Sequence, residues 1–250
     1  MTGGSRGIGA STVRVLQSNG ATVLFCARSE ISIKALESEL GSGTGFPPVV
    51  GLVCDMESQQ QREKLITDVK AKVQRIDILV NNVGGGGRWG EPDPLMPQSQ
   101  VWEECIDKNL GSMRQLCSAF VPDMVKNKWG RVITVGSIFG TAGGGRPWFQ
   151  VSKAAQINFS KNLSLRPEFA SRGVTFNCVS PGPVLIPGTG WHVEFEKNSS
   201  LYQKTIEAVP IRRLLDPTEV SSVIAFLASD YSAGINGQNI VIDGGRLETL

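Results

Sequence analysis

TGGSRGIG, residues 2–9, is a glycine-rich turn that leads directly into a helical pattern over Ile8–Ser18. Glycine lets a backbone approach a ligand closely, and a helix N-terminus offers free N–H groups and the positive end of a dipole. The combination is typical of a turn that holds the pyrophosphate of a dinucleotide. A glycine-rich helix entry without a ligand has the same local pattern, so the turn alone does not separate the two.

Strand-like and helix-like segments alternate downstream of the turn. Strands are predicted at Ala21–Ala27, Val49–Cys54, Ile76–Val80, Arg131–Val135, Val174–Val179 and Gln238–Ile242. Helices are predicted at Ser29–Leu40, Glu57–Gln74, Ser99–Asn127, Pro147–Phe169 and Pro217–Ala228, and residues 181–210 are expected to be irregular. This order predicts one doubly wound α/β domain over residues 1–250, a Rossmann-like three-layer αβα arrangement with a parallel sheet. Ligands then bind beyond the carboxyl ends of the strands.

One strand is missing from this pattern. A dinucleotide turn should follow a strand, yet only Met1 precedes Thr2. In the usual strand order 3-2-1-4-5-6 the first strand is central. We therefore expect a truncated N-terminal strand, through a start codon placed too late or a shortened chain. The alternative is a chain that repacks without it. Without the first strand, the strands on either side of its place would leave a gap or pair directly.

Composition and charge exclude several classes of protein. Hydrophobic residues make up 40% of the 250 residues, which excludes a disordered chain. The net charge of +2 gives no electrostatic reason to expect nucleic acid or an anionic membrane as a partner. No run of 18 apolar residues spans a membrane, and no secretory signal is present, so we expect a cytoplasmic protein. The five cysteines lack C-x-x-C spacing, and we expect no disulfide framework and no metal site.

The motifs taken together resemble the short-chain dehydrogenase/reductase family, over essentially the whole length from Thr2. They are T-G-x-x-x-G-x-G at residues 2–9, Asp55 after a strand, N-N-x-G at Asn81–Gly84, Asn109, Ser137, Lys153 in S-K-A-A, Pro181-Gly182, and G-Q-x-x-x-x-D-G-G at Gly237–Gly245. Each motif is short, but this set in this order is highly specific. The resemblance implies a nicotinamide dinucleotide cofactor, a small-molecule carbonyl or hydroxyl substrate, and a homodimer or homotetramer.

The resemblance also assigns the cofactor site, with Asp55 accepting from the adenine amine. The cofactor-binding residues it implies are Gly3, Ser5, Arg6, Gly7, Ile8, Gly9, Arg28, Asp55, Asn81, Val83, Gly84, Lys153, Pro181, Gly182 and Val184. Members that bind NAD(H) carry an acidic residue where this chain has Ala27. Arg6 and Arg28 instead place two guanidiniums near the ribose, and arginine matches a phosphate well. We therefore predict NADP(H) over NAD(H), the alternative for Arg28 being a solvated surface arginine.

The catalytic positions of the family are only partly kept. A Ser that orients the carbonyl, a Tyr that passes the proton, a Lys four residues later and an Asn that anchors a relay water carry the chemistry. Ser137, Lys153 and Asn109 match three of them, but Phe149 stands at the tyrosine position. Losing a positioned acid typically costs about 10²–10⁴ in rate. The hydroxyl expected four residues after Gly182 is also absent, because that residue is Ile186.

Substitutes for the phenol come from the segment that in the family folds over the substrate, a lid at about residues 183–210. His192 and Tyr202 could act as the acid, as could Lys153 through a water. Candidate substrate contacts are Trp148, Trp191, His192, Tyr202, Arg88, Trp89 and Arg146, although each has a plainer interpretation as a packed or solvated side chain. Two hypotheses remain open. One is an NADP(H)-dependent oxidoreductase with an altered site, and the other is a catalytically inactive dinucleotide-binding homologue that serves as a sensor or partner subunit.

Overall fold

The computed structural model describes residues 1–41, 45–86, 90 and 99–248. Its strands are all parallel and form two sheets. The smaller sheet pairs β1 (Val23–Ala27) with β2 (Val49–Val53). The larger sheet has the order β3 (Ile78–Asn81), β4 (Gly130–Val135), β5 (Val174–Pro181) and β6 (Asn239–Ile242). Both β4 and β5 are buried along their whole length, as expected for strands covered by helices on both faces. The α/β Rossmann-like fold is confirmed.

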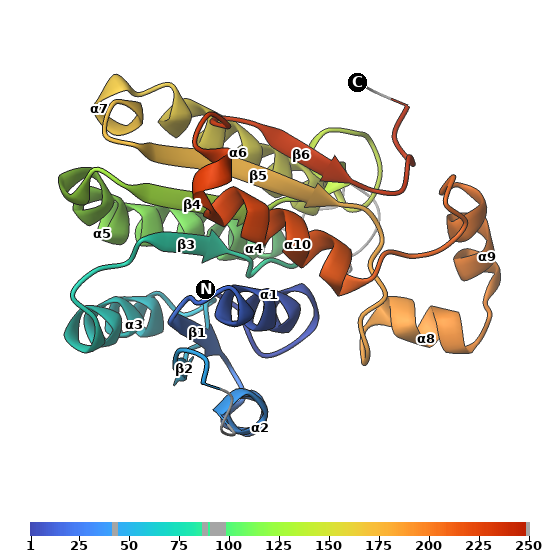
Figure 1. Ribbon diagram of the computed structural model, residues 1–250. Coiled ribbons are helices and arrows are strands. Elements are labelled where there is room, and N and C mark those ends of the chain that lie inside the picture. The colour runs from blue at the N-terminus through green and yellow to red at the C-terminus, as the bar shows by residue number, and fades with distance from the viewer. Residues whose placement is uncertain (42–44, 87–89, 91–98, 249–250) are drawn as a thin grey trace.

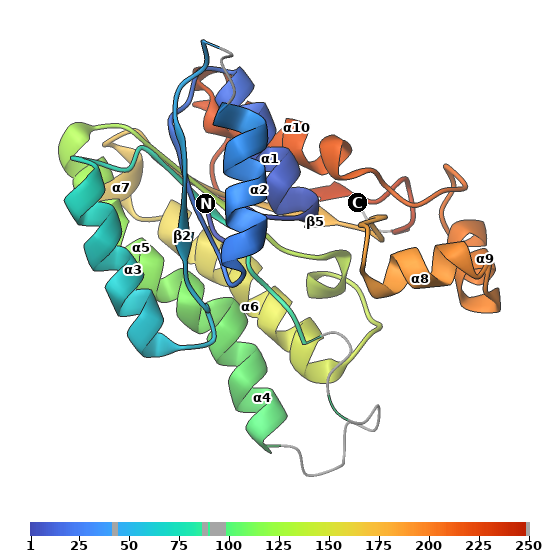
Figure 2. The same cartoon turned by 90° about the horizontal axis from the view of Figure 1, so that it is seen from below.

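Helices cover both faces of the strands (Figures 1 and 2). On one face lie α1 (Gly7–Ser18), α2 (Glu30–Gly41) and α10 (Pro217–Ala228), and α1 packs against α10. On the other lie α3 (Gln59–Lys72), α4 (Ser99–Ile106), α5 (Ser112–Asn127) and α6 (Pro147–Ser164), followed by the short α7 (Pro167–Ala170). The hydrophobic core is accordingly divided into two clusters, one on each side. At the start of α10, Asp216 and Glu219 form a capping box.

Three predicted segments differ from the structure. The long helix Ser99–Asn127 is interrupted by a π-helical turn, Asp107–Gly111, which separates α4 from α5. The helix Pro147–Phe169 ends at Ser164, because the residue before Pro167 is driven out of the helical region. Residues 181–210 are not irregular throughout. They contain α8 (Gly190–Glu196) and α9 (Ser200–Glu207), which project beyond the carboxyl ends of the strands (Figure 1).

Residues 1–3 lie between the two sheets and join them through the backbone. Thr2 forms an isolated parallel bridge with Cys26 of β1, and its N–H donates to the Val80 carbonyl oxygen of β3 at 3.0 Å. The buried amino group of Met1 donates to the Leu24 carbonyl oxygen at 2.8 Å, and burial lowers the pKa of this amine. Among the described residues no strand precedes β1. Of the two arrangements considered for the flanking strands, the structure therefore has the gap.

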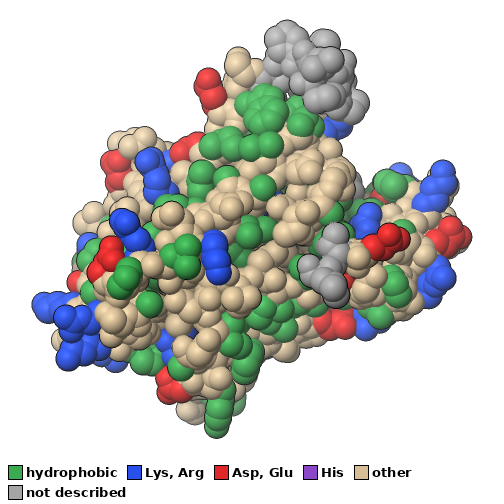
Figure 3. Space-filling view, turned by 90° about the horizontal axis from the view of Figure 1, so that it is seen from above, with side chains coloured by type: hydrophobic (Ala, Val, Ile, Leu, Met, Phe, Trp, Pro, Cys, Tyr) green, Lys and Arg blue, Asp and Glu red, His purple; other side chains and the backbone are tan. Residues whose placement is uncertain are grey.

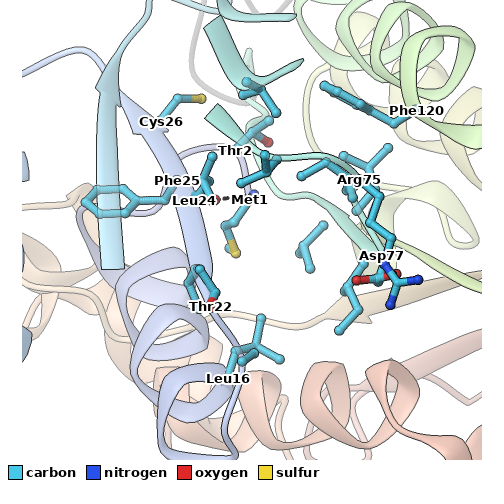
Figure 4. A pocket seen from close by; sticks show the side chains of 18 of the residues that line it. Met1, Thr2, Leu16, Thr22, Leu24, Phe25, Cys26, Arg75, Asp77 and Phe120 are labelled. Atoms are coloured by element: carbon cyan, nitrogen blue, oxygen red, sulfur yellow. Dashed lines mark hydrogen bonds and ion pairs between the residues drawn. The ribbon is translucent and has the colours of Figure 1, made fainter. Parts of the chain in front are cut away.

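This gap is a cavity of about 770 Å³, which we call the inter-sheet slot (Figure 4). Both β1 and β3 line it, and Met1 and Thr2 close one end. Leu16, Leu65 and Phe120 reach it from the helices on the two sides. Both core clusters contain side chains from β1 and from the larger sheet, so packing on the two faces holds the sheets together where backbone hydrogen bonds do not.

The outer surface carries charges of both signs. In Figure 3, Lys and Arg side chains gather at the end where α7 lies in Figure 1, and acidic and basic side chains mix at the α8–α9 end. The described part of this face therefore shows no continuous basic tract toward the strand carboxyl ends. In the described residues no helix is long and apolar enough to cross a membrane.

Candidate active site

A pocket of about 870 Å³ lies at the carboxyl ends of the strands, where an open parallel sheet places its ligands. It is lined by the glycine-rich turn, by the residues that follow β1, β2, β3, β4 and β5, by the start of α6 and by the start of α8. Of the residues predicted to bind the cofactor, those that line it are Gly3, Ser5, Arg6, Gly7, Ile8, Gly9, Arg28, Asp55, Val83, Gly84, Lys153, Pro181, Gly182 and Val184.

The N-terminus of α1 forms one wall of the pocket. Arg6 is its N-cap, and no side chain caps the first turn and no acidic residue lies in it. The positive end of the helix dipole and its free N–H groups therefore remain available to an anion. Gly9 is required by close packing, because a Cβ there would lie 1.9 Å from the Gly3 carbonyl oxygen. The cradle fits a pyrophosphate.

Charged side chains surround the wall beside this helix. Arg6 and Arg28 both line the pocket. Ala27, the last residue of β1, lines it as well. Glu57 lies 4.0 Å from the Arg28 guanidinium and 2.5 Å from Lys108 Nζ, so it offsets part of this positive charge. Asp55 Oδ1 accepts from the Glu57 backbone N–H at 3.1 Å, which fixes the carboxylate at the pocket edge.

Asn81 and Asn82 have different places from those that the sequence suggested. Asn81 is buried at the end of β3 and is not among the residues that line the pocket, and its Nδ2 lies 3.9 Å from Cys117 Sγ. Asn82 lines the pocket instead and donates to the Thr2 and Gly3 carbonyl oxygens at 2.9 and 3.2 Å. It therefore fixes the glycine-rich turn on the end of β3. The signal in the sequence that could have identified Asn82 is the second asparagine of the N-N-x-G motif.

Ser137, Phe149 and Lys153 line the opposite end of the pocket. Ser137 follows β4, and its Oγ accepts from the Phe139 N–H at 3.2 Å, which orients the hydroxyl. Phe149 packs edge-on against Phe139, and Lys153 Nζ lies 5.8 Å from the centre of the Phe149 ring. Burial lowers the pKa of Lys153 to about 8. The structure thus brings together three of the four predicted catalytic residues around one space.

Asn109, the fourth, is fully buried in the π-helical turn behind this space. Its Nδ2 donates to the Gly85 and Cys105 carbonyl oxygens at 2.9 and 2.7 Å, and its Oδ1 accepts from the Gly85 N–H at 3.2 Å. Its backbone carbonyl accepts from Gln156 Nε2 at 2.9 Å, and Gln156 Oε1 accepts from Lys153 Nζ at 2.9 Å. Sequence reasoning missed Gln156, because a single glutamine on a helix has no motif around it.

The candidate substrate residues are dispersed. Trp191, at the start of α8, lines the pocket. His192 and Tyr202 are not among the described lining residues, since His192 Nδ1 lies 3.5 Å from Glu196 and Tyr202 packs against Phe195. Trp148 is fully buried, with its indole N–H donating to the Gly86 carbonyl oxygen at 2.9 Å.

Of the arginines, Arg146 is the residue before α6, whereas Arg88 and Trp89 lie outside the described residues. The same described part of the chain contains no cluster of three His, Cys, Asp or Glu side chains that could hold a metal ion.

Comparisons with known proteins agree on the family. The family described as Enoyl-(Acyl carrier protein) reductase matches residues 3–246. The chain is 35% identical over 248 residues to the 3-oxoacyl-[acyl-carrier-protein] reductase FabG of Escherichia coli (strain K12), covering 98% of this chain and 95% of that protein.

Solved structures are similar as well. A variant of actinorhodin polyketide ketoreductase with NADPH superposes with a TM-score of 0.86 at 28% identity, covering 99% of this chain and 96% of that one. A 3-oxoacyl-[acyl-carrier protein] reductase with bound NAD from Brucella melitensis has a TM-score of 0.83 at 24% identity, covering 98% and 89%, which supports the fold alone.

Proposed function

The chain belongs to the short-chain dehydrogenase/reductase family, and we propose that it is an NADP(H)-dependent oxidoreductase that acts on a carbonyl or hydroxyl group. One observation carries the proposal. A single pocket joins the anion cradle at the N-terminus of α1 to the end where Ser137 and Lys153 meet. A nicotinamide dinucleotide carries its charged pyrophosphate between the adenosine and the reactive nicotinamide ring, so a pyrophosphate held at α1 would let the ring reach Ser137 and Lys153.

The preference for NADP(H) rests on charge. Arg6 and Arg28 line the wall beside the α1 N-terminus, and Ala27 leaves no carboxylate at the end of β1 to repel a ribose phosphate. A guanidinium can bind a phosphate through two hydrogen bonds. One of the similar structures contains NADPH and another contains NAD. The preference for NADP(H) therefore depends on the side chains of this chain and not on its relatives.

At the other end, the nicotinamide would supply or accept the hydride when it is bound. The Ser137 hydroxyl is placed to hold the substrate oxygen, and Phe149 has no proton to give. The Lys153 ammonium lies 5.8 Å from the centre of the Phe149 ring and lines the same pocket as Ser137. Its pKa of about 8 suits an acid that works near neutral pH. We assign to Lys153 both the ribose contact and the delivery of the proton, directly or through a water.

The lid at about residues 183–210 would cover the substrate, with Trp191 facing the pocket. The relatives that act on 3-oxoacyl groups make a 3-oxoacyl thioester the first probe of substrate class. A homodimer or homotetramer is the assembly we expect.

The test is a fluorescence titration of the purified chain with NADPH and NADH, followed by NADPH oxidation in the presence of acetoacetyl-CoA. We expect tighter binding of NADPH. Arg28→Ala should reduce that preference by about tenfold, as expected for loss of a charge-assisted hydrogen bond. Arg172→Ala, an exposed arginine after α7, is the matched control and should change neither affinity. Equal affinity for both nucleotides in the unmodified chain would contradict the NADP(H) assignment.

The second candidate is a catalytically inactive dinucleotide-binding homologue. It is favoured by the absence of a tyrosine or histidine among the described residues that line the pocket. It predicts tight NADPH binding with no turnover of acetoacetyl-CoA or of a panel of small ketones, aldehydes and alcohols. Turnover of any of these that is lost in Ser137→Ala would reject it.

A further inference from the structure

Gln156 is a fully buried polar side chain that none of the motifs includes. It lies in α6 three residues after Lys153, so both side chains share one helix face. Its exposed fraction is 0% and that of Lys153 is 3%. Burying an amide is costly unless both of its polar ends are hydrogen-bonded.

Both ends of this amide are used, and both point to the catalytic end of the pocket. Gln156 Oε1 accepts from Lys153 Nζ at 2.9 Å, and Gln156 Nε2 donates to the Asn109 carbonyl oxygen at 2.9 Å. The second contact fixes the orientation of the amide, because a flipped amide would place two oxygens together. Lys153 Nζ also donates to the Val135 carbonyl oxygen at 2.8 Å. Two of its three N–H groups thus face inward, and one remains for the pocket.

From this geometry we propose that Gln156 is a positioning residue that keeps the Lys153 ammonium charged and directs its remaining N–H into the pocket. A hydrogen bond accepted from the charged form of a lysine favours that form. The oriented carbonyl of Gln156 therefore opposes the desolvation of Lys153. The inference on the charge state stands on this chain alone, whereas its consequence for ligand binding rests on the proposed function.

Among the described residues, the other titratable groups that act on Lys153 are thiols. Cys105 from α4 and Cys178 from β5 act on its charge, and burial raises the pKa of both, to about 11 for Cys178. Both shifts favour the neutral thiol. The inward contacts that stabilise the ammonium are therefore the Gln156 and Val135 oxygens, and neither of these can take up and release a proton. Lys153 then exchanges its proton through the pocket, and a bound ligand would hold it in its charged form.

The test measures the pKa of Lys153 directly, by carbon NMR of ¹³C-labelled lysine in the ligand-free protein, with Lys153→Arg to assign the signal. Gln156→Met keeps the length of the side chain and removes both polar ends, and we expect the pKa to fall by about one unit. Gln156→Glu places a carboxylate beside the Lys153 ammonium, and we expect the pKa of Lys153 to rise by about one unit. Gln150→Met, in the same helix but bonded to the Ala142 carbonyl oxygen, is the control and should leave it unchanged.

Opposite shifts distinguish positioning from a purely structural role, which would move the pKa in the same direction in both variants or in neither. Either of those results would overturn the inference. If Gln156→Met does not fold, Gln156→Glu alone decides, and a pKa that does not rise rejects the proposal.

The pH dependence of NADPH affinity separates this inference from the proposed function. Affinity should be full below the pKa of Lys153 and fall about tenfold per pH unit above it. The onset of this fall should shift with the variants as the NMR value does. Opposite NMR shifts without any NADPH binding would support the role of Gln156 and reject the proposed function.

Discussion

The two ends of the pocket are built by different means. At the α1 end, the proposed cofactor would meet backbone N–H groups, a helix dipole and the charges of Arg6 and Arg28. At the α6 end, the chemistry depends on individual side-chain protons, and Phe149 offers none. Where several groups share the binding of one anion, we expect the loss of one side chain to weaken binding only in part. A proton-transfer site depends on one positioned group, so a single substitution changes what it can do.

The largest effect should follow from returning a proton donor to the α6 end. Phe149→Tyr places a phenol beside Lys153, whose ammonium favours the phenolate. We expect the rate of acetoacetyl-CoA reduction to rise by about 10²–10⁴. Phe226→Tyr, on the exposed face of α10, is the control and should have no effect. A rate that falls would mean that Phe149 belongs to a pocket adapted to another reaction. The α6 end would then not be a site that has lost its proton donor.

At the α1 end, we expect a large loss of NADPH affinity only from a change that displaces the backbone of the glycine-rich turn. In Gly9→Ala the new Cβ would meet the Gly3 carbonyl oxygen, which must then move away and open the turn. We expect NADPH affinity to fall about 100-fold, as an overpacked position costs up to about 3 kcal/mol. Gly41→Ala, where a Cβ meets nothing within 4 Å, should bind normally. If Gly9→Ala binds within a few-fold of the unmodified chain, the turn is not the main ligand contact.

Single polar contacts at the α1 end should matter least. Asp55→Ala removes a carboxylate at the pocket edge, and we expect affinity to fall about tenfold for NADPH and NADH alike. Arg28→Ala should instead weaken NADPH alone, which distinguishes the adenine side from the phosphate side in the same titration. Asp68→Ala, paired with Lys64 on α3, is the control. A loss confined to one nucleotide would place Asp55 near the ribose and not near the adenine.

Periodicity and turn chemistry were sufficient to predict most of the fold. The alternation of apolar runs and helical patterns predicted all six strands of the described structure and the three-layer order. The α10 N-terminus was predicted to the residue, because Pro217 is a residue type that favours the first position of a helix. The π-helical turn at Asp107–Gly111 was not predictable, because an extra residue in a helix leaves the apolar spacing nearly unchanged.

The site was predictable where motifs are contiguous and not where packing decides. The glycine-rich turn was found from its contiguous motif, and Ser137, Lys153 and Phe149 were found through the resemblance to the short-chain dehydrogenase/reductase family. Asn81 was assigned to the pocket and is instead buried, because strand alternation at the end of β3 turns it inward and Asn82 outward. Gln156 needed the structure, since its two partners come from different elements.

The inter-sheet slot has a consequence for how fast backbone amides exchange with solvent. Within the described part of the chain, residues 1–3 supply the backbone hydrogen bonds between β1 and β3, and the rest of these two strand edges lines a slot that is open to solvent. Amide groups at an edge without a partner strand exchange through local openings of low free energy. The amide hydrogens of β1 and β3 should therefore exchange faster than those of β4 and β5, which are paired with a strand on both sides.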